Sequence, residues 1–196
     1  MKNAKLFSFI AVIIAIGAAA TFFMKKSRNE PASQPIAPAN KKLTTNLNNM
    51  KITSSAFENN ANIPPKYTCD GENISPALQF SDVPMGAQSL AFILHDPDAP
   101  VAGGFTHWVI FNIDPATKEI TENNAPTNAI QGQNSAGQAK YTSPCPPSGT
   151  HHYEFRIYAL DEKLNLDSSA KKADVEKAME GHILDETSLV GLYQRL

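Results

Sequence analysis

Three mainly apolar runs of strand length, separated by turns rich in proline and glycine, limit what this chain can fold into. They are Ser89–Leu94, His107–Ile113 and Tyr153–Leu160. The first two are apolar almost throughout, which predicts strands buried on both faces, and the third alternates with a period of two. Weaker runs at Ile52–Phe57 and Ala77–Phe80 add two candidate strands. The chain is therefore expected to be dominated by β-sheet.

Helical periodicity is clear only near the carboxyl end, at Ala173–Glu180. Val175, Ala178 and Met179 recur at the spacing of one helix face, and Gly181 follows as a carboxy-terminal stop. Many strands followed by one late helix predict an all-β fold, an antiparallel β-sandwich with a short C-terminal helix.

Composition divides the chain into three segments. Leu6–Met24 is an uncharged run of 19 residues, which at about 1.5 Å per residue matches a hydrocarbon core of about 30 Å. Residues 1–26 are therefore interpreted as a membrane anchor or a secretory signal, with Ala18-Ala19-Ala20 as a small-residue cleavage pattern. Residues 27–50 predict a flexible linker, and residues 51–196 predict one folded domain. We expect this domain to be exported to the periplasm or another extracytoplasmic face, anchored by residues 6–24.

The charge of the folded segment disfavours one class of partner. From Leu43 onward the chain carries 10 Lys and Arg against 18 Asp and Glu, a formal net charge of −8. Nucleic-acid binding requires clustered cations that meet phosphates, so no nucleic-acid partner is expected. Ile120–Ala139 has almost no hydrophobic residues and is predicted to be a long surface connection.

The two cysteines, Cys69 and Cys145, both lie in the folded segment. An even pair in an oxidising compartment favours a disulfide. Two free, half-buried thiols are the alternative, because spacing along the chain does not establish disulfide geometry.

A small set of polar side chains lies at the ends of the predicted strands. His151 and Tyr153 are two residues apart, so they share one face of a strand that extends back from Tyr153. Asp96 follows the Ser89–Leu94 run, and His107 begins the next one. Imidazole and phenol groups donate hydrogen bonds to anions, and a carboxylate orients a histidine and favours its charged form. The pattern predicts a small anion pocket at the sheet rim.

The same residues are compatible with two other kinds of site. Cys145 could act as a nucleophile in a hydrolase, but no separate base and orienting group can be placed for it. His107 and His151 with Asp96 or Asp98 could bind zinc, but the sequence lacks closely spaced ligand pairs. No catalytic residue, metal or cofactor is therefore predicted.

Several segments, taken in order, resemble the phosphatidylethanolamine-binding protein family in its bacterial, Raf-kinase-inhibitor-like branch. The resemblance covers Lys51–Leu196 and rests on Tyr67–Pro76, Asp96–Pro100, Gly104–Asn112, Tyr141–Tyr153 and Ala178–His182. It implies a Greek-key β-sandwich that binds phosphate-type head groups. The ligand-binding residues that it implies are Asp96, Asp98, Phe105, His107, Pro146, His151 and Tyr153.

Each of these residues has an expected role, from its side-chain chemistry or, for Pro146 and Phe105, from the resemblance. His107 and His151 would donate to the anion, Tyr153 would be a neutral donor, and Asp96 would orient a histidine. Asp98 would shape the turn, Pro146 would form a wall, and Phe105 stands at an aromatic position that is often Trp.

Anion binding is expected to weaken as pH rises through the histidine pKa values. At least one cis X-Pro bond is expected in the proline-rich turns. Because eukaryotic members bind kinases and other partners, an inhibitor of a kinase or hydrolase with a vestigial pocket is an alternative. A hydrolase that uses the same pocket is another. The sequence leaves homodimer formation open.

Overall fold

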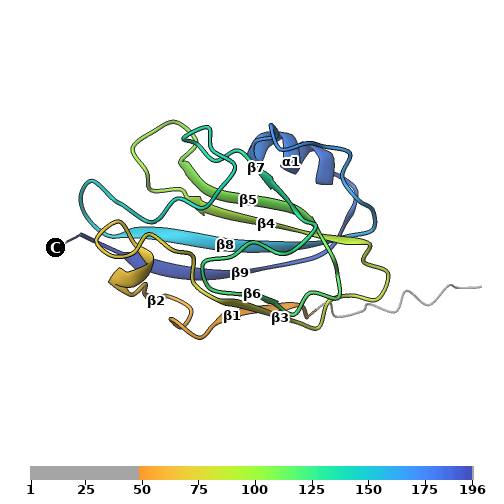
Figure 1. Cartoon of the computed structure of the whole chain (residues 1–196), viewed down its shortest axis with the longest axis horizontal. Helices are drawn as coiled ribbons and strands as arrows, with labels where there is room; N and C mark the ends of the chain where they lie inside the picture. Colours follow the sequence, from red (N-terminus) through yellow and green to blue (C-terminus); the bar gives the residue numbers. More distant parts are fainter. Residues whose placement is uncertain (1–48, 196) are drawn as a thin grey trace, which may run out of the picture. The chain divides into compact units, whose positions relative to one another are not determined.

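The computed structural model describes residues 49–195, which fold mainly into β-strands (Figure 1). Along the chain the elements are β1 (Lys51–Ser54), β2 (Ala61–Asn62), the short 3-10 helix η1 (Pro65–Tyr67), β3 (Leu78–Ser81), β4 (Ser89–Asp96), β5 (Phe105–Ile113), β6 (Glu119–Ile120), β7 (Ile130–Gly132), β8 (His151–Leu160), α1 (Lys172–Met179) and β9 (Ile183–Tyr193).

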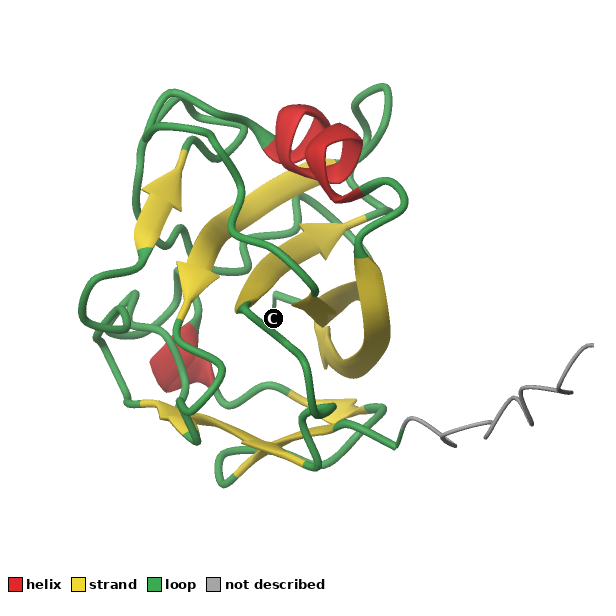
Figure 2. Ribbon diagram, turned by 90° about the vertical axis from the view of Figure 1, so that its right-hand side faces the viewer, coloured by secondary structure: helices red, strands yellow, loops and turns green. Residues whose placement is uncertain are grey.

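These strands form a small and a large sheet. The small sheet has the order β1-β3-β6, and the large one has the order β2-β9-β8-β4-β5-β7. Neighbouring strands are antiparallel, except that β2 runs parallel to β9, with Ala61 opposite Gly191. Figure 2 shows the large sheet between α1 on one side and the small sheet on the other.

The hydrophobic core lies between the two sheets. Ile52 of the small sheet belongs to the same buried cluster as Phe92 and Phe155 of the large sheet. The opposite face of β4 carries Ile93, which packs in a second cluster with Val175 of α1. Because β4 and β5 are covered on both faces, their sequences are apolar without alternation.

The prediction of a fold dominated by β-strands with one short helix is confirmed. The helix begins and ends one residue earlier than expected, and it precedes β9 instead of closing the chain. The sequence reasoning missed β9, because only its second half, at Leu189, Gly191 and Tyr193, shows regular burial. Its pairing with β8 extends along the whole of β8, so hydrogen bonds between the strands stabilise β9 although its sequence pattern is weak. The Greek-key arrangement of the connections stays a prediction.

Some expectations fail or lie outside the described residues. Ile120–Ala139 is not only surface, since β7 pairs with β5 and Asn134 is buried. Residues 49–195 contain no cis peptide bond, so the expected cis X-Pro bond is wrong for this part. The apolar run at residues 6–24 lies outside the described residues, and no helix within 49–195 has the length and apolar character to span a membrane.

Candidate functional site

Three strand ends bring the predicted polar residues together. Asp96 is the last residue of β4. Phe105 is the first residue of β5 and His107 follows two positions later, while His151 is the first residue of β8. Because β4 is antiparallel to both β5 and β8, its last residues lie beside the first residues of those two strands. Sheet topology therefore gathers side chains that are far apart in the sequence.

A pocket of about 190 Å³ lies at this rim. It is lined by Asp96, Ala99, Pro100, Val101, Phe105, His107, Thr142, Ser143, Cys145, Pro146, Pro147 and His151. Of the residues expected from the sequence, Asp98 and Tyr153 are absent from this lining. Sequence reasoning did not assign Ala99, Val101, Thr142, Ser143 and Pro147 to the site, although all of them except Val101 lie within the motifs Asp96–Pro100 and Tyr141–Tyr153.

His151 is oriented by Asp96. Its Nδ1 donates to Asp96 Oδ2 over 2.7 Å, and the two side chains are only 8% and 4% exposed. The other carboxylate oxygen, Oδ1, accepts the backbone N–H of Asp98 over 2.9 Å. Both oxygens are thus held, and Nε2 is the ring nitrogen of His151 that is left for a ligand.

His107 differs from the expectation of a charged donor. Its Nδ1 lies 2.8 Å from the carbonyl oxygen of Thr142, and a carbonyl only accepts, so Nδ1 carries the proton. Burial lowers the pKa of His107 to about 4, so the ring is neutral near pH 7. Its Nε2 then presents a lone pair, which is buried without a hydrogen-bond partner among the described residues. The free site therefore offers an acceptor at this position.

Tyr153 lies buried among the histidines. Its ring centroid is 5.3 Å from that of His107 and 6.4 Å from that of His151. Its hydroxyl is the other buried side-chain atom within residues 49–195 that has no hydrogen-bond partner. Burial, with the nearby charge of Asp96, raises the pKa of Tyr153 above its usual range, so the phenol remains a neutral donor.

Asp98 sits on the surface beside the pocket. Its Oδ2 accepts hydrogen bonds from the backbone N–H of His152 over 2.8 Å and from the His152 ring over 2.7 Å. These bonds lower the pKa of the Asp98 carboxyl. Through its own N–H, Asp98 also holds Asp96, so its contribution is to fix the turn after β4.

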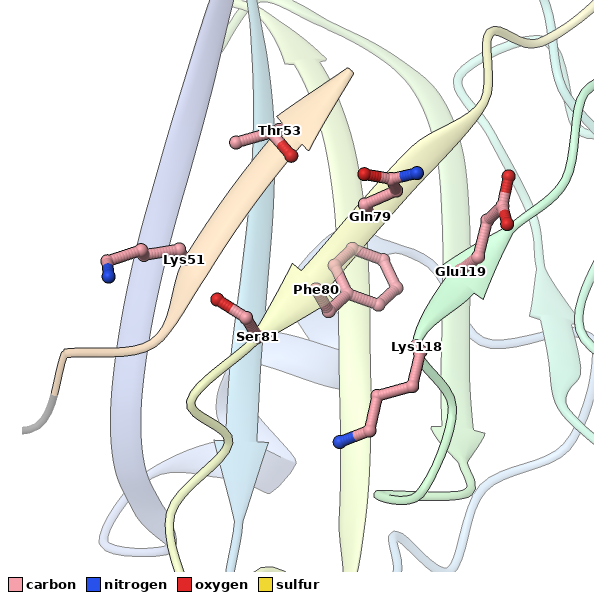
Figure 3. Close-up of a pocket in the computed structure, with 7 residues that line it drawn as sticks. All are labelled: Lys51, Thr53, Gln79, Phe80, Ser81, Lys118 and Glu119. Atoms are coloured by element: carbon pink, nitrogen blue, oxygen red, sulfur yellow. The ribbon is translucent and has the colours of Figure 1, made fainter. Parts of the chain in front are cut away.

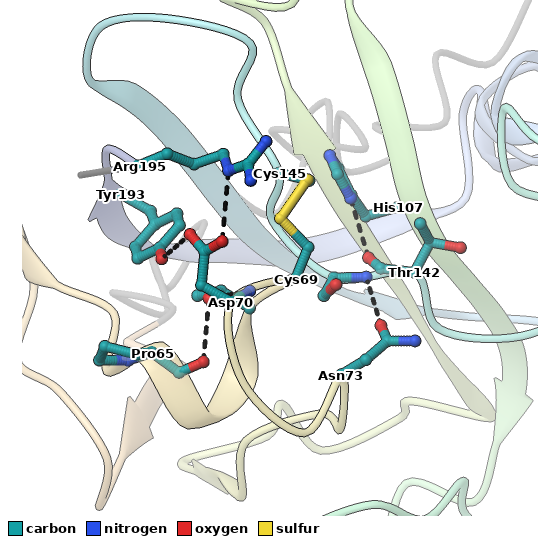
Figure 4. The surroundings of a disulfide bond; sticks show 11 residues. Pro65, Cys69, Asp70, Asn73, His107, Thr142, Cys145, Tyr193 and Arg195 are labelled. Carbon is teal, nitrogen blue, oxygen red and sulfur yellow. Dashed lines mark hydrogen bonds and ion pairs between the residues drawn. A yellow bond between two sulfur atoms is a disulfide. The ribbon is translucent and has the colours of Figure 1, made fainter.

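One pocket wall is fastened to the segment Tyr67–Pro76 (Figure 4). Cys69 and Cys145 form a disulfide with a Cα–Cα distance of 5.4 Å, so the first of the two cysteine alternatives is the observed one. The Cys69 N–H donates to the Pro144 carbonyl, and the Ser143 N–H donates to Asn73 Oδ1 over 3.1 Å. Because Cys145 is bonded to Cys69, it has no free thiol to act as a nucleophile.

The opposite side of the pocket is aromatic and apolar. The Phe105 ring centroid lies 4.7 Å from that of His107, and the planes are tilted by 56°. Val101 is 54% exposed at the same rim. A ligand would therefore meet polar groups at the pocket floor and apolar groups at its mouth. Within residues 49–195, no group of three His, Cys, Asp or Glu side chains is arranged to hold a metal ion.

A larger hollow of about 370 Å³ lies on the outer face of the small sheet (Figure 3). Its rim carries Lys51, which pairs with Asp82 over 3.2 Å, and both side chains are more than half exposed. Phe80 also contributes to its lining, although that side chain is almost fully buried. Neither of the unpartnered buried atoms belongs to this hollow, so the histidine pocket is the better candidate site.

Comparisons with known proteins agree on one family. A sequence model described as phosphatidylethanolamine-binding protein matches residues 53–194. A UPF0098 protein from Methanothermobacter thermautotrophicus is 51% identical over 151 residues, which is 74% of this chain and 99% of the relative.

Solved structures show the same likeness. A protein from Chlamydia trachomatis, described as a homologue of phosphatidylethanolamine-binding protein, is 41% identical with a TM-score of 0.73, covering 76% of this chain and 99% of its own. YbcL from Escherichia coli, described as a new member of the mammalian PEBP family, is 30% identical with a TM-score of 0.71, covering 75% and 99%.

Proposed function

Because this chain belongs to the phosphatidylethanolamine-binding protein family, we propose that its histidine pocket binds a small phosphate-type anion or the head group that carries one. The names of the family and of the UPF0098 relatives describe no catalytic activity. The proposed role is accordingly binding, with no reaction step.

The observation that carries the proposal is a pair of buried polar atoms without partners, the Tyr153 hydroxyl and His107 Nε2. A buried polar atom that makes no hydrogen bond costs free energy on the order of 1–3 kcal/mol. A ligand that supplies both partners recovers that free energy. The two ring centroids are 5.3 Å apart, so the two atoms belong to neighbouring side chains, of which His107 lines the pocket.

The Tyr153 hydroxyl and His107 Nε2 favour different groups on the ligand. Tyr153 donates, so it favours an unprotonated oxygen, whereas His107 Nε2 accepts, so it favours a ligand that brings a proton. The monoanion of a phosphate monoester has both kinds of oxygen, and its second pKa is about 6. Binding is therefore expected to weaken as pH rises through about 6, when that proton is lost.

The pocket volume restricts the size of the bound group. Drug-sized ligands occupy sites of roughly 300–1,000 Å³, and the pocket measures about 190 Å³. A phosphate with a short substituent fits this space. Any longer apolar part would extend past Val101 and Pro147 at the mouth.

Calorimetric titration of the full chain with methyl phosphate at pH 5.5 and pH 8 tests the proposal. We expect tighter binding at pH 5.5, and a loss of at least about tenfold in His151→Ala, since a hydrogen bond to a charged group contributes about 1.5–3 kcal/mol. His182→Ala is the matched control, because His182 pairs with Asp161 at the other end of β8. No binding by the wild-type chain at either pH would reject the pocket and favour a partner-binding role.

Dimethyl phosphate sharpens this test. It carries the same single charge as the methyl phosphate monoanion but has no proton to donate. We expect it to bind more weakly at pH 5.5. Equal affinity of the two ligands would show that His107 does not act as the acceptor.

We also propose that the domain is exported and anchored by residues 6–24. The Cys69–Cys145 disulfide supports this, because disulfides persist in oxidising compartments. The test is whether added protease cleaves the domain in cells whose outer layers have been removed but whose cytoplasmic membrane is intact. Protection of the domain under those conditions would reject the proposal.

A further inference from the structure

The disulfide is part of the pocket as well as a link within the fold. Cys145 lines the pocket, between Pro144 and Pro146, while Cys69 lies 76 residues earlier, just after η1. Both cysteine residues are exposed to solvent. In Figure 4 the bond joins the loop around Asp70 to the loop that carries Thr142 and Cys145, beside His107 of β5.

The wall has a well-bonded half and a poorly bonded half. Before Cys145, the Thr142 N–H donates to the His107 carbonyl over 3.0 Å, and the Pro144 carbonyl accepts from Cys69 over 3.0 Å. From residue 145 to residue 149 the chain makes no hydrogen bond between backbone groups with any other described residue. Between residues 145 and 149 the disulfide and the packing of the buried Pro146 therefore restrain the wall that leads into His151.

The same residue also lines the pocket that contains Asp96, His107 and His151. Movement of Cys145 would therefore change the wall that it forms together with Pro146.

We propose that thiol–disulfide exchange at Cys69 and Cys145 sets the ligand affinity of the pocket, high in the oxidised chain and low in the reduced one. This inference rests on the proposed anion binding. The disulfide forms when a thiolate of the chain attacks a disulfide of an exchange partner and the second cysteine thiolate displaces that partner. The chain loses two electrons and two protons, and the partner disulfide becomes a dithiol. Reduction by a dithiol reverses both steps.

Exposure makes this exchange accessible in the folded state. Attack requires a thiolate to reach a sulfur, and exposed disulfides are the labile class. A chain synthesised with reduced cysteines would have a loose pocket wall, and oxidation outside the cytoplasm would complete the site. Ligand binding would then be restricted to the oxidising compartment.

The test compares methyl phosphate binding by the oxidised full chain, the chain reduced with dithiothreitol, and the double variant Cys69→Ser, Cys145→Ser. If the unlinked wall is in place about one-fifth of the time, affinity falls about fivefold, because apparent affinity scales with the competent fraction. Reoxidation should restore the affinity of the wild-type chain. Ser148→Ala, exposed in the same stretch, is the matched control and should bind as the wild type does.

Three results would overturn the inference. The first is a disulfide that resists dithiothreitol in the folded protein. The second is a reduced chain that melts at a lower temperature but binds with unchanged affinity, which would make the bond purely structural. If the oxidised chain binds no methyl phosphate, the proposed function itself fails. In that case amide hydrogen exchange at residues 148–150 tests separately whether the disulfide restrains the pocket wall. Equal protection of these amides in both redox states is the third result that would overturn the inference.

Discussion

Two neighbouring histidines of β8 make the same contact in opposite surroundings. His151 Nδ1 lies 2.7 Å from Asp96, and His152 Nδ1 lies 2.7 Å from Asp98. The first pair is 8% and 4% exposed, and the second is 55% and 41% exposed. Strand alternation alone separates them, since successive side chains point to opposite faces of a sheet.

The comparison shows that burial, and not distance, decides what each pair does. In the exposed pair each partner is also well solvated when the contact is broken, so the contact contributes little to stability. The buried pair has lost its water, and each partner depends on the other to compensate for that loss. The buried pair can therefore hold a pocket in a fixed geometry, while the exposed pair fixes only the turn around Asp98.

The largest expected difference between the pairs is in stability. Asp96→Ala leaves His151 buried without its partner and should lower the free energy of unfolding by about 3–5 kcal/mol. Asp98→Ala should lower it by less than about 1 kcal/mol, because that pair is solvated. Urea unfolding at pH 7 measures both. Similar losses in the two variants would show that burial does not distinguish the pairs.

The second effect is the dependence of stability on pH that the buried His107 causes. Burial holds the pKa of His107 at about 4, below the 6.5 of an ordinary histidine, so the unfolded chain binds the extra proton first. Stability is complete above pH 6.5 and should fall by roughly 3 kcal/mol as pH drops to about 4. His107→Gln should flatten this part of the unfolding profile. A slope that persists in the variant would place the titrating group elsewhere.

The third effect is on ligand affinity. His151→Ala removes a group that faces the ligand and should weaken methyl phosphate binding by about tenfold to a hundredfold. His152→Ala should stay within about twofold, because its side chain points away from the pocket. Calorimetry on both variants compares them directly, and a comparable loss in His152→Ala would mean that the ligand reaches the outer face.

The smallest effect is the titration of Asp98. Its hydrogen bonds from His152 lower the pKa of the carboxyl, so the stability that they provide is present above about pH 4 and is lost as pH falls through the lowered value. His152→Ala should move the carboxyl pKa back toward about 3.9. Carbon-detected NMR titration measures this shift. An unchanged Asp98 pKa would assign the lowering to another neighbour.

The strong strands and the motifs between them were predictable, and the weak elements were not. Ser89–Leu94 is apolar because β4 is covered on both faces, so its burial was visible in the sequence. Most of β9 faces solvent on one side or lies half-buried, so its residues lack a clear period. The segment Tyr67–Pro76 was recognised as a motif, but its hydrogen bonds to the pocket wall required the folded chain.

The sequence alone indicated the family, the β-rich fold and five residues that meet in one pocket. Strand alternation and strand ends pointed to Asp96, His107 and His151, whereas Phe105 and Pro146 followed from the resemblance of the motifs to the family. The tertiary structure decided which histidine is paired and which is neutral. That depends on the Thr142 carbonyl beside His107 and on the loss of water around its ring. Desolvation is a property of the packed surroundings, and no local pattern encodes it.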